Sequence, residues 1–206
     1  MTEMTFGNTP IDGGNLLLSR TELEDLRLTE AQKSEFVRRI LGSAEFIRGL
    51  ERYCLWIEED RKGAALSIPV IAQRVEAVRR VRSAGGRTAK DIANRPYQFQ
   101  RTYVGKYSTM IVPSVSSEVR EYLPCGYLPA GYVVSNLAFA QYDAPVWNMA
   151  LIASRLHVVW IATVCGKLET RYRYSNTLGW NTFPVPTLTD KNKDDLTRCA
   201  EDILLA

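Results

Sequence analysis

The chain has 206 residues, of which 46% are hydrophobic and 24% charged, and its formal net charge is +3. This composition predicts one large globular domain or two small ones, and it excludes disorder over most of the length. The overall charge says little about partners, but its distribution is uneven. Residues 74–106 contain nine Lys or Arg against two acids, which is +7 and leaves −4 for the remainder.

The first part of the chain carries clear turn and cap signals. Residues 12–14, Asp-Gly-Gly, predict a turn, and the apolar residues 16–18 predict a short strand after it. Residues 19–22 and 29–32 both fit the capping box, in which a hydroxyl and a carboxyl or amide satisfy free backbone N–H groups. We therefore expect two helices, the second ending at Gly42.

A buried strand is predicted at residues 53–57, followed by a helix with one basic face. Pro69 opens this helix, whose apolar stripe is Ile71, Val75, Val78 and Val81. The other face carries Arg74, Arg79, Arg80 and Arg82. Nucleic acid and solvent explain that face equally well. Residues 83–86 should end the helix, and Thr88 should cap a short turn after it.

The second half predicts strands at residues 101–107, 109–113 and 132–140 and a final helix at about 190–204. The longest apolar run, residues 145–165, is interpreted as one buried helix. A membrane span is disfavoured because Arg155 and His157 lie in its middle.

Residues 171–174, Arg-Tyr-Arg-Tyr, alternate cations and aromatic rings. In an extended strand the guanidinium groups would lie on one face and the rings on the other. The rings could then anchor the strand while the cations meet phosphates or guanine edges. An edge strand with a solvated basic face is the plainer reading.

No catalytic or metal-binding constellation is predicted. The four cysteines are far apart and His157 is the single histidine, so zinc-ligand spacing is missing. His157 lies in an apolar segment and is interpreted as a core or interface histidine, not a general base. Residues 60–62, Asp-Arg-Lys, could serve a metal-dependent nuclease with Asp12 as a distant acid. A solvated charged turn explains them better.

Residues 94–97, Asn-Arg-Pro-Tyr, are the nearest string to the motif with which adenine amino-methyltransferases hold a flipped base. Arg95 stands where that motif has its first proline, so the tight turn is lost. No glycine-rich strand-to-helix turn marks an S-adenosylmethionine site either. We therefore predict no cofactor for this chain.

Five separated blocks stand out in chain order: FGNTPIDGGNL from Phe6, RYCLW from Arg52, IVPSVSSEVR from Ile111, SRLH from Ser154 and YRYSNT from Tyr172. Together they resemble the target-recognition domain of MmeI-like restriction-modification enzymes and related adenine DNA methyltransferases. The resemblance spans nearly the whole chain. It implies a domain that follows the methyltransferase domain of a larger bacterial protein and reads the base sequence of duplex DNA. The parent would use S-adenosylmethionine and could also cut DNA.

The expected architecture is α+β, a single domain of mixed helices and antiparallel strands. Residues 1–186 would form the recognition domain, and a C-terminal helix within 187–206 would pack on it as part of the same unit. The chain would be a fragment of a larger protein. Cysteines embedded in apolar stretches, without a signal peptide, predict a cytoplasmic protein and no membrane.

Candidate DNA contacts fall into three groups. Glu118 and Arg120 project the same way if their segment is extended, and with Ser116 and Ser117 they are expected beside bases or the adjoining phosphates. The second group is Arg171, Arg173, Ser175 and Asn176. The phosphate candidates are Arg79, Arg82, Arg87, Arg101 and Lys106.

Two other classes of function stay open. The chain could be a protein-interaction scaffold whose basic window, residues 74–106, binds an acidic partner. Competition by duplex DNA of defined sequence would separate that function from DNA recognition. An isolated enzyme would need a cofactor site that the sequence does not provide.

Overall fold

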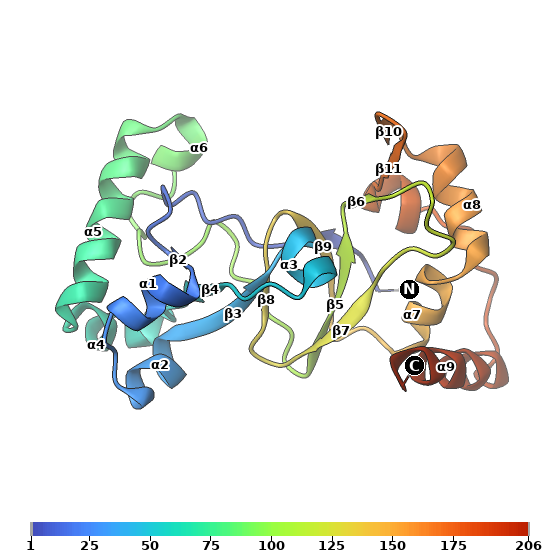
Figure 1. Cartoon of the computed structure of the whole chain (residues 1–206), viewed down its shortest axis with the longest axis horizontal. Coiled ribbons are helices and arrows are strands. Elements are labelled where there is room, and N and C mark those ends of the chain that lie inside the picture. Colours follow the sequence, from blue (N-terminus) through green and yellow to red (C-terminus); the bar gives the residue numbers. More distant parts are fainter. Residues whose placement is uncertain (1, 206) are drawn as a thin grey trace.

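The computed structural model describes residues 2–205 and mixes helices with mainly antiparallel strands, which confirms the α+β class (Figure 1). Its α-helices are α1 (Arg20–Asp25), α2 (Glu30–Phe36), α3 (Ser43–Arg48), α4 (Lys62–Leu66), α5 (Pro69–Ala84), α6 (Arg87–Lys90), α7 (Trp147–Ile152), α8 (Arg155–Val164) and α9 (Asp190–Leu205), and two short helices of other types span Glu59–Arg61 and Asn176–Trp180. Its strands are β1 (Thr5–Phe6), β2 (Leu17–Leu18), β3 (Val37–Leu41), β4 (Tyr53–Leu55), β5 (Ser108–Pro113), β6 (Val115–Ser116), β7 (Gly126–Pro129), β8 (Val133–Val134), β9 (Ala138–Tyr142), β10 (Lys167–Leu168) and β11 (Arg171–Arg173).

One part of the molecule, at the left in Figure 1, packs α1, α2, α4 and α5 around the sheet β2-β4-β3-β8. Leu18 and Leu55 of the sheet, Ile71 and Val75 of α5 and Phe99 belong to one buried cluster. Ile71, Val75 and Val78 of the apolar stripe therefore face this core, as their helical spacing predicts. Val81 is 41% exposed, so the stripe does not extend to it as expected.

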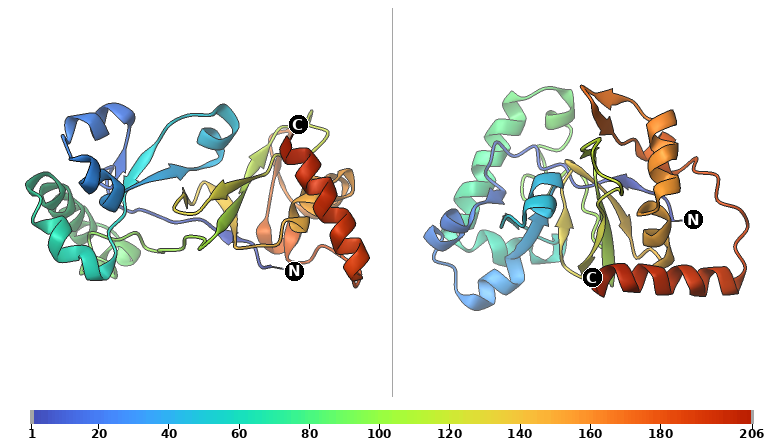
Figure 2. Two further views of the ribbon diagram at one scale, coloured as in Figure 1. Left: turned by 90° about the horizontal axis from the view of Figure 1, so that it is seen from below. Right: turned by 45° about the vertical axis from the view of Figure 1, so that its right-hand side comes forward.

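The other part is built on the sheet β1-β9-β5-β7, with α7, α8 and α9 on one side of it. Successive side chains of β5 point to opposite faces of the sheet. Met110 and Val112 pack in a cluster with Ile152 of α7 and Ala200 of α9. Ile111 packs instead in the cluster that contains Val134 of β8. Figure 2 shows α9 against α7 on the outside of this part.

Irregular segments also join the two parts, and Asn8 holds them together. The Asn8 side chain donates to the Tyr103 carbonyl at 2.8 Å and to the Val134 carbonyl at 3.1 Å, and it accepts from the Tyr103 N–H at 2.8 Å. Asn8 is completely buried. Next to it, Gly7 lies so close to the Ser135 carbonyl that no Cβ would fit. Gly7 and Asn8, from the opening block of the sequence, thus connect the two parts of the fold.

Local signals predicted most helix starts correctly. Ser19 and Thr29 both make the full capping box, and Pro69 occupies the first turn of α5. The second helix, however, ends at Phe36, so the expected end at Gly42 is wrong. Residues 37–41 form β3 instead, because they pair with β4 at one end and with β8 at the other.

The predicted strand at residues 101–107 is wrong, because side chains take the hydrogen bonds that a strand partner would make. The Tyr103 N–H donates to Asn8, and the Gly105 N–H donates to the Thr109 hydroxyl at 3.2 Å. The carboxylate of Asp143 accepts from the backbone N–H groups of residues 106, 107 and 108. These bonds lower the pKa of Asp143, the one to Tyr107 most. The segment is an irregular, well-bonded loop.

Three further elements differ from expectation. Residues 132–140 are divided into β8 and β9 by a turn. The apolar run 145–165 is two helices, because the Ser154 side chain accepts from the His157 N–H and caps α8. The outer face of α8 is exposed, with Leu156 at 69% and Val159 at 63%, so this run is not wholly buried. Gly86, not Thr88, is the N-cap of α6.

Across residues 2–205, no helix combines the length and the apolar character that crossing a bilayer requires.

Candidate nucleic-acid interface

Residues 171–173 of the basic segment form an extended strand, β11, as the alternation predicts, and Tyr174 follows it directly. Arg171 and Arg173 of β11 are exposed, Tyr172 is half-buried and Tyr174 is buried. The Tyr174 hydroxyl lies 3.0 Å from Nε2 of His157, and His157 also packs on Trp180 and Phe183. The rings therefore anchor the strand to the core while both guanidinium groups face outward.

Strands β10 and β11 form a hairpin whose turn is Glu169 and Thr170. Glu169 adopts a left-handed backbone with φ 58°. Its carboxylate pairs with Arg171 at 2.7 Å. The Thr170 hydroxyl donates to a carboxylate oxygen of Glu118 at 2.7 Å, although 52 positions separate the two residues. The hairpin turn is thus bonded to the segment that follows β6, and β6 itself pairs with β11.

The segment 117–122 is a surface loop, so the condition that Glu118 and Arg120 lie in an extended segment is not met. The Arg120 N–H donates to the Ser117 carbonyl at 3.2 Å, and the Ser117 hydroxyl accepts from the Val119 N–H at 3.4 Å. Residues 118–122 are all exposed, between the buried Ser116 and the buried Leu123. Glu121 anchors the loop to α8 through an ion pair with Arg155 at 3.1 Å.

Ser116 lies in β6 and is 4% exposed, so its side chain is not presented to a ligand as expected. Ser117 fills the turn-capping role that its position allows. Ser175 and Asn176 also have structural partners: the Ser175 hydroxyl accepts from the Leu178 N–H, and the Asn176 amide donates to the Met4 carbonyl at 2.8 Å. The exposed candidates of these first two groups are therefore Glu118, Arg120, Arg171 and Arg173.

The electrostatics of this surface are uneven. The hydrogen bond from Thr170 lowers the pKa of the Glu118 carboxyl, and nearby Arg171 and Lys167 lower it further. Within residues 2–205, Arg120, Lys167 and Arg173 make no ion pair with a carboxylate. Glu169 and Glu121 are paired with arginines, whereas Glu118 has no ion-pair partner within residues 2–205 and lies near unneutralised cations. This arrangement is suited to a ligand that offers phosphates together with amino groups.

Arg82 was expected to contact phosphate, and that expectation is wrong. Its side chain is completely buried and donates to the carbonyl groups of residues 10, 11, 92, 95 and 98 at 2.7–3.1 Å. It continues the spacing of Ile71, Val75 and Val78 along α5. That spacing is the signal by which the sequence could have identified it. Burial lowers the pKa of Arg82 to about 10, which leaves it charged at neutral pH.

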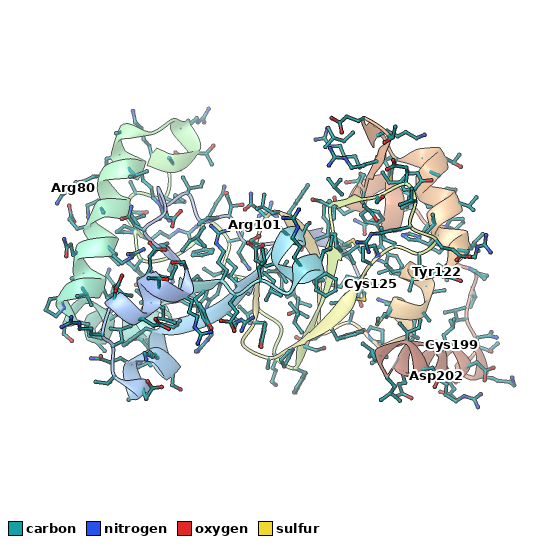
Figure 3. The ribbon with its side chains drawn as sticks, viewed as in Figure 1. Arg80, Arg101, Tyr122, Cys125, Cys199 and Asp202 are labelled. Carbon is teal, nitrogen blue, oxygen red and sulfur yellow. The ribbon has the colours of Figure 1, made fainter. Side chains whose placement is uncertain are left out.

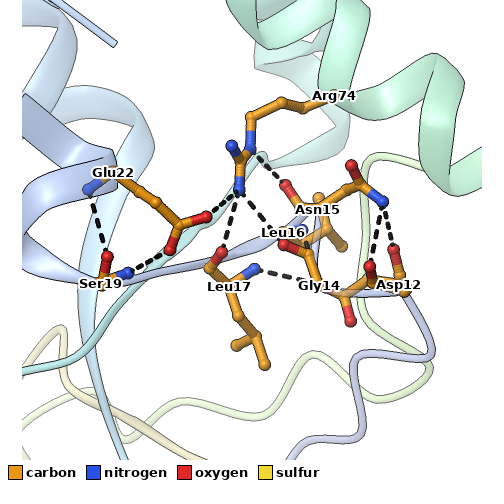
Figure 4. A network of polar contacts seen from close by, with 9 residues as sticks. Asp12, Gly14, Asn15, Leu16, Leu17, Ser19, Glu22 and Arg74 are labelled. Carbon is orange, nitrogen blue, oxygen red and sulfur yellow. Dashed lines mark hydrogen bonds and ion pairs between the residues drawn. The ribbon is translucent and has the colours of Figure 1, made fainter. Parts of the chain in front are cut away.

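The other basic residues of α5 also have protein partners. Arg74 holds the loop before β2: it donates to the carbonyl groups of Gly14, Asn15 and Leu17 and pairs with Glu22 (Figure 4). Arg79 pairs with Glu76 at 3.1 Å. The basic face of α5 is therefore in good part a structural and solvated face.

The remaining phosphate candidates lie in different places. Arg87 of α6 is exposed, and α6 projects on the same side of the molecule as the β10–β11 hairpin (Figures 1 and 2). Arg101 is exposed and lies between the two parts (Figure 3). Lys106 packs over the Tyr107 ring just before β5, whereas β11 pairs with β6 beyond the other end of β5. The structure thus places α6, which carries Arg87, and the β10–β11 hairpin on one side of the molecule and separates Lys106 from the hairpin.

Catalytic alternatives find no support in the geometry. His157 is buried among aromatic rings, and burial lowers its pKa to about 4, as for a core histidine. Asp12 is buried and accepts from the N–H groups of Leu16 and Leu17. Asp60 and Arg61 are exposed in a short 3-10 helix, Glu59–Arg61, and Lys62 begins α4, so the expected charged turn is helical. Within residues 2–205, no three His, Cys, Asp or Glu side chains gather as a metal site would require.

All four cysteines are free thiols. Cys54 and Cys165 are buried and Cys125 is partly buried, as expected for core residues, and burial raises the pKa of Cys125 to about 12. Cys199 is exposed, so the core reading does not extend to it.

Comparison with known protein families shows which family this chain belongs to. A family model described as "MmeI, target recognition domain" matches residues 1–187. The chain belongs to the MmeI target recognition domain family. This confirms the resemblance that the five sequence blocks suggested.

Two relatives place the domain in larger proteins. DNA methyltransferase A of Bacillus subtilis (strain 168) is 37% identical over 206 residues, which is 99% of this chain and 23% of that protein. A solved structure of the Type IIL restriction-modification enzyme MmeI in complex with DNA matches all of this chain with a TM-score of 0.91 at 29% identity, and the match covers 28% of that chain. The present chain thus spans about a quarter of the length of these relatives.

Proposed function

We propose that this chain reads the base sequence of duplex DNA on behalf of a larger restriction-modification enzyme or adenine-specific DNA methyltransferase. The observation that carries the proposal is the surface formed by the β10–β11 hairpin and the loop 118–122. That surface combines unneutralised cations with a fixed carboxylate, in a chain of this family. Cations meet the phosphates, and side-chain donors and acceptors meet the base edges.

Glu118 and Arg120 are the proposed base-reading residues, because both side chains are exposed at the tip of an anchored loop. Carboxylates accept from cytosine N4, and arginine donates to guanine O6 and N7. Arg173, Arg171, Arg87 and Arg101 are proposed as backbone contacts. Lys106 and Arg79 would reach only the outer part of a bound duplex, and Ser117, Ser175 and Asn176 would support the surface from behind.

The parent protein is proposed to supply the chemistry. Its methyltransferase domain would hold S-adenosylmethionine, which donates a methyl group when bound, and endonuclease activity would belong to the parent as well. This chain does not fit the cofactor: the β3–α3 turn carries a single glycine, Gly42, whose N–H donates to Glu45. A cytoplasmic location is proposed from the four free cysteines.

We also propose that residues 187–206 belong to the same structural unit as 1–186. Support comes from α9, which buries Ala200 in the cluster that contains Met149 of α7. Residues 1 and 206, the outermost bounds of that division, lie outside the described residues.

The direct test is selection from a random duplex DNA library at moderate salt, followed by sequencing of the bound molecules. An enriched motif of several base pairs supports sequence recognition. Retention of DNA without a motif would reduce the chain to a backbone-binding module. If no DNA is retained and acidic proteins are, the scaffold alternative replaces the proposal.

Arg173 offers a sharper prediction about the backbone contacts. Arg173→Gln should weaken binding to all sequences alike and reduce the slope of log K against log salt by about 0.9, because one phosphate contact is lost. The enriched motif should not change. Arg80→Gln is the matched control, since Arg80 points outward from α5 and is 79% exposed (Figure 3). A changed motif in Arg173→Gln would show that Arg173 reads a base.

A further inference from the structure

The bond between Thr170 and Glu118 joins a hairpin turn to an exposed loop. A glutamate with a free carboxylate samples many rotamers in solvent, and a hydrogen bond to one oxygen restricts that freedom. At 2.7 Å the bond from the Thr170 hydroxyl is of normal length for an O–H donor and a carboxylate. The carboxylate keeps acceptor positions for other donors, because its two oxygens offer about four.

The donor that holds Glu118 is neutral, although cations lie close by. Arg171 and Lys167 are near enough to lower the pKa of Glu118. Arg171 nevertheless pairs with Glu169, its neighbour on the other side of Thr170. Among residues 2–205, no cation forms an ion pair with Glu118. Arg171 thus pairs with Glu169, while the Thr170 hydroxyl donates to Glu118. The Glu118 carboxylate therefore stays negative and is not neutralised by an ion pair.

A fixed carboxylate on a phosphate-binding surface has a narrow range of partners. Phosphate oxygens repel it, as do the acceptor groups of guanine and thymine. The exocyclic amino groups of cytosine and adenine donate, and acidic side chains most often accept from cytosine N4. Such a contact requires the carboxylate to be held in one place.

We propose that Thr170 is a positioning residue that orients the Glu118 carboxylate toward the amino group of one base, cytosine N4. The inference rests on the proposed function, because it needs Glu118 to face DNA. Thr170 itself touches no base. It fixes the direction of the acceptor, and Glu169 assists by holding Arg171 aside.

The test compares Thr170→Val, which keeps the shape and removes the hydroxyl, with Thr170→Ser, which keeps the hydroxyl. Each variant is put through the same duplex-library selection as the unsubstituted protein. Thr170→Val should lower discrimination at one base pair of the motif by roughly tenfold and leave the other positions unchanged. Thr170→Ser should discriminate at that base pair as well as the unsubstituted protein does. Thr163→Val, which removes an exposed hydroxyl bonded within α8, is the control and should change nothing.

A second readout does not depend on DNA. The pKa of the Glu118 carboxyl, followed by NMR, should rise toward its ordinary value in Thr170→Val and stay low in Thr170→Ser. A rise in Thr170→Val without any change in the motif would overturn the inference and leave the proposed function intact. Equal relaxation at every base pair, with a lower melting temperature, would also overturn it, because the bond would then only hold the loop. Absence of any motif for the unsubstituted protein would instead reject the proposed function, and the inference with it.

Discussion

Replacement of Arg82 tests whether a buried cation holds the first part of the molecule together. In Arg82→Met the chain keeps a long side chain on α5 but loses the donors to the five carbonyl groups. A hydrogen bond from a charged donor contributes about 1.5–3 kcal/mol when buried, and less where water can replace the donor. One of the five bonds is fully buried and four are partly exposed.

We therefore expect Arg82→Met to lower the free energy of unfolding by roughly 3–5 kcal/mol, a large fraction of the 5–15 kcal/mol typical of a domain. Urea denaturation followed by tryptophan fluorescence measures the change as a lower midpoint at constant slope. Arg82→Lys should fall between, since an ammonium group has three donors. Arg80→Met, on the exposed face of α5, should change stability by less than about 0.5 kcal/mol. A loss below about 1 kcal/mol in Arg82→Met would refute the proposed role of these bonds.

Two further predictions concern packing and pH. Gly7→Ala should lower the free energy of unfolding by about 2–3 kcal/mol, because the added Cβ would collide with the Ser135 and Val134 carbonyls. The control is Gly63→Ala in α4, whose added Cβ meets no atom, so that this variant should be neutral or stabilising. Equal urea midpoints for the two variants would contradict the prediction. The pKa of His157, about 4 in the folded protein against an ordinary 6.5, means that the unfolded chain binds the proton first as the pH falls. Stability should therefore be full above about pH 6.5 and decrease by roughly 3 kcal/mol toward pH 4, while His157→Gln should lack this decrease; parallel pH profiles would exclude His157 as its source.

The sequence predicted those elements whose cause is local. The capping boxes at Ser19 and Thr29 need only residues three positions away, and Pro69 marks the start of α5 without tertiary help. The strand β3 could not be predicted in this way. Residues 37–41 continue the chain directly from α2, and they become a strand only because β4 and β8 lie on either side.

The candidate site shows the same division between local and distant causes. Alternation alone placed the arginines of β11 outward and Tyr174 inward. Charge alone misplaced Arg82, because the carbonyl groups that it satisfies come from residues up to 72 positions away. Thr170 carried no signal that would single it out, since its importance depends on a contact with Glu118 across 52 positions.

The exposed run 118–122, between buried Ser116 and Leu123, has an evolutionary consequence. Exposed side chains without a structural partner are under little pressure from folding, so most substitutions of Val119, Arg120 or Tyr122 leave the scaffold intact. Two other side chains of the run hold the loop in place, because Glu118 bonds to Thr170 of the β10–β11 hairpin and Glu121 pairs with Arg155 of α8. New side chains would therefore appear at a constant place on an unchanged frame. Descendants of this chain can exchange the chemistry of that surface one residue at a time, without passing through unstable intermediates.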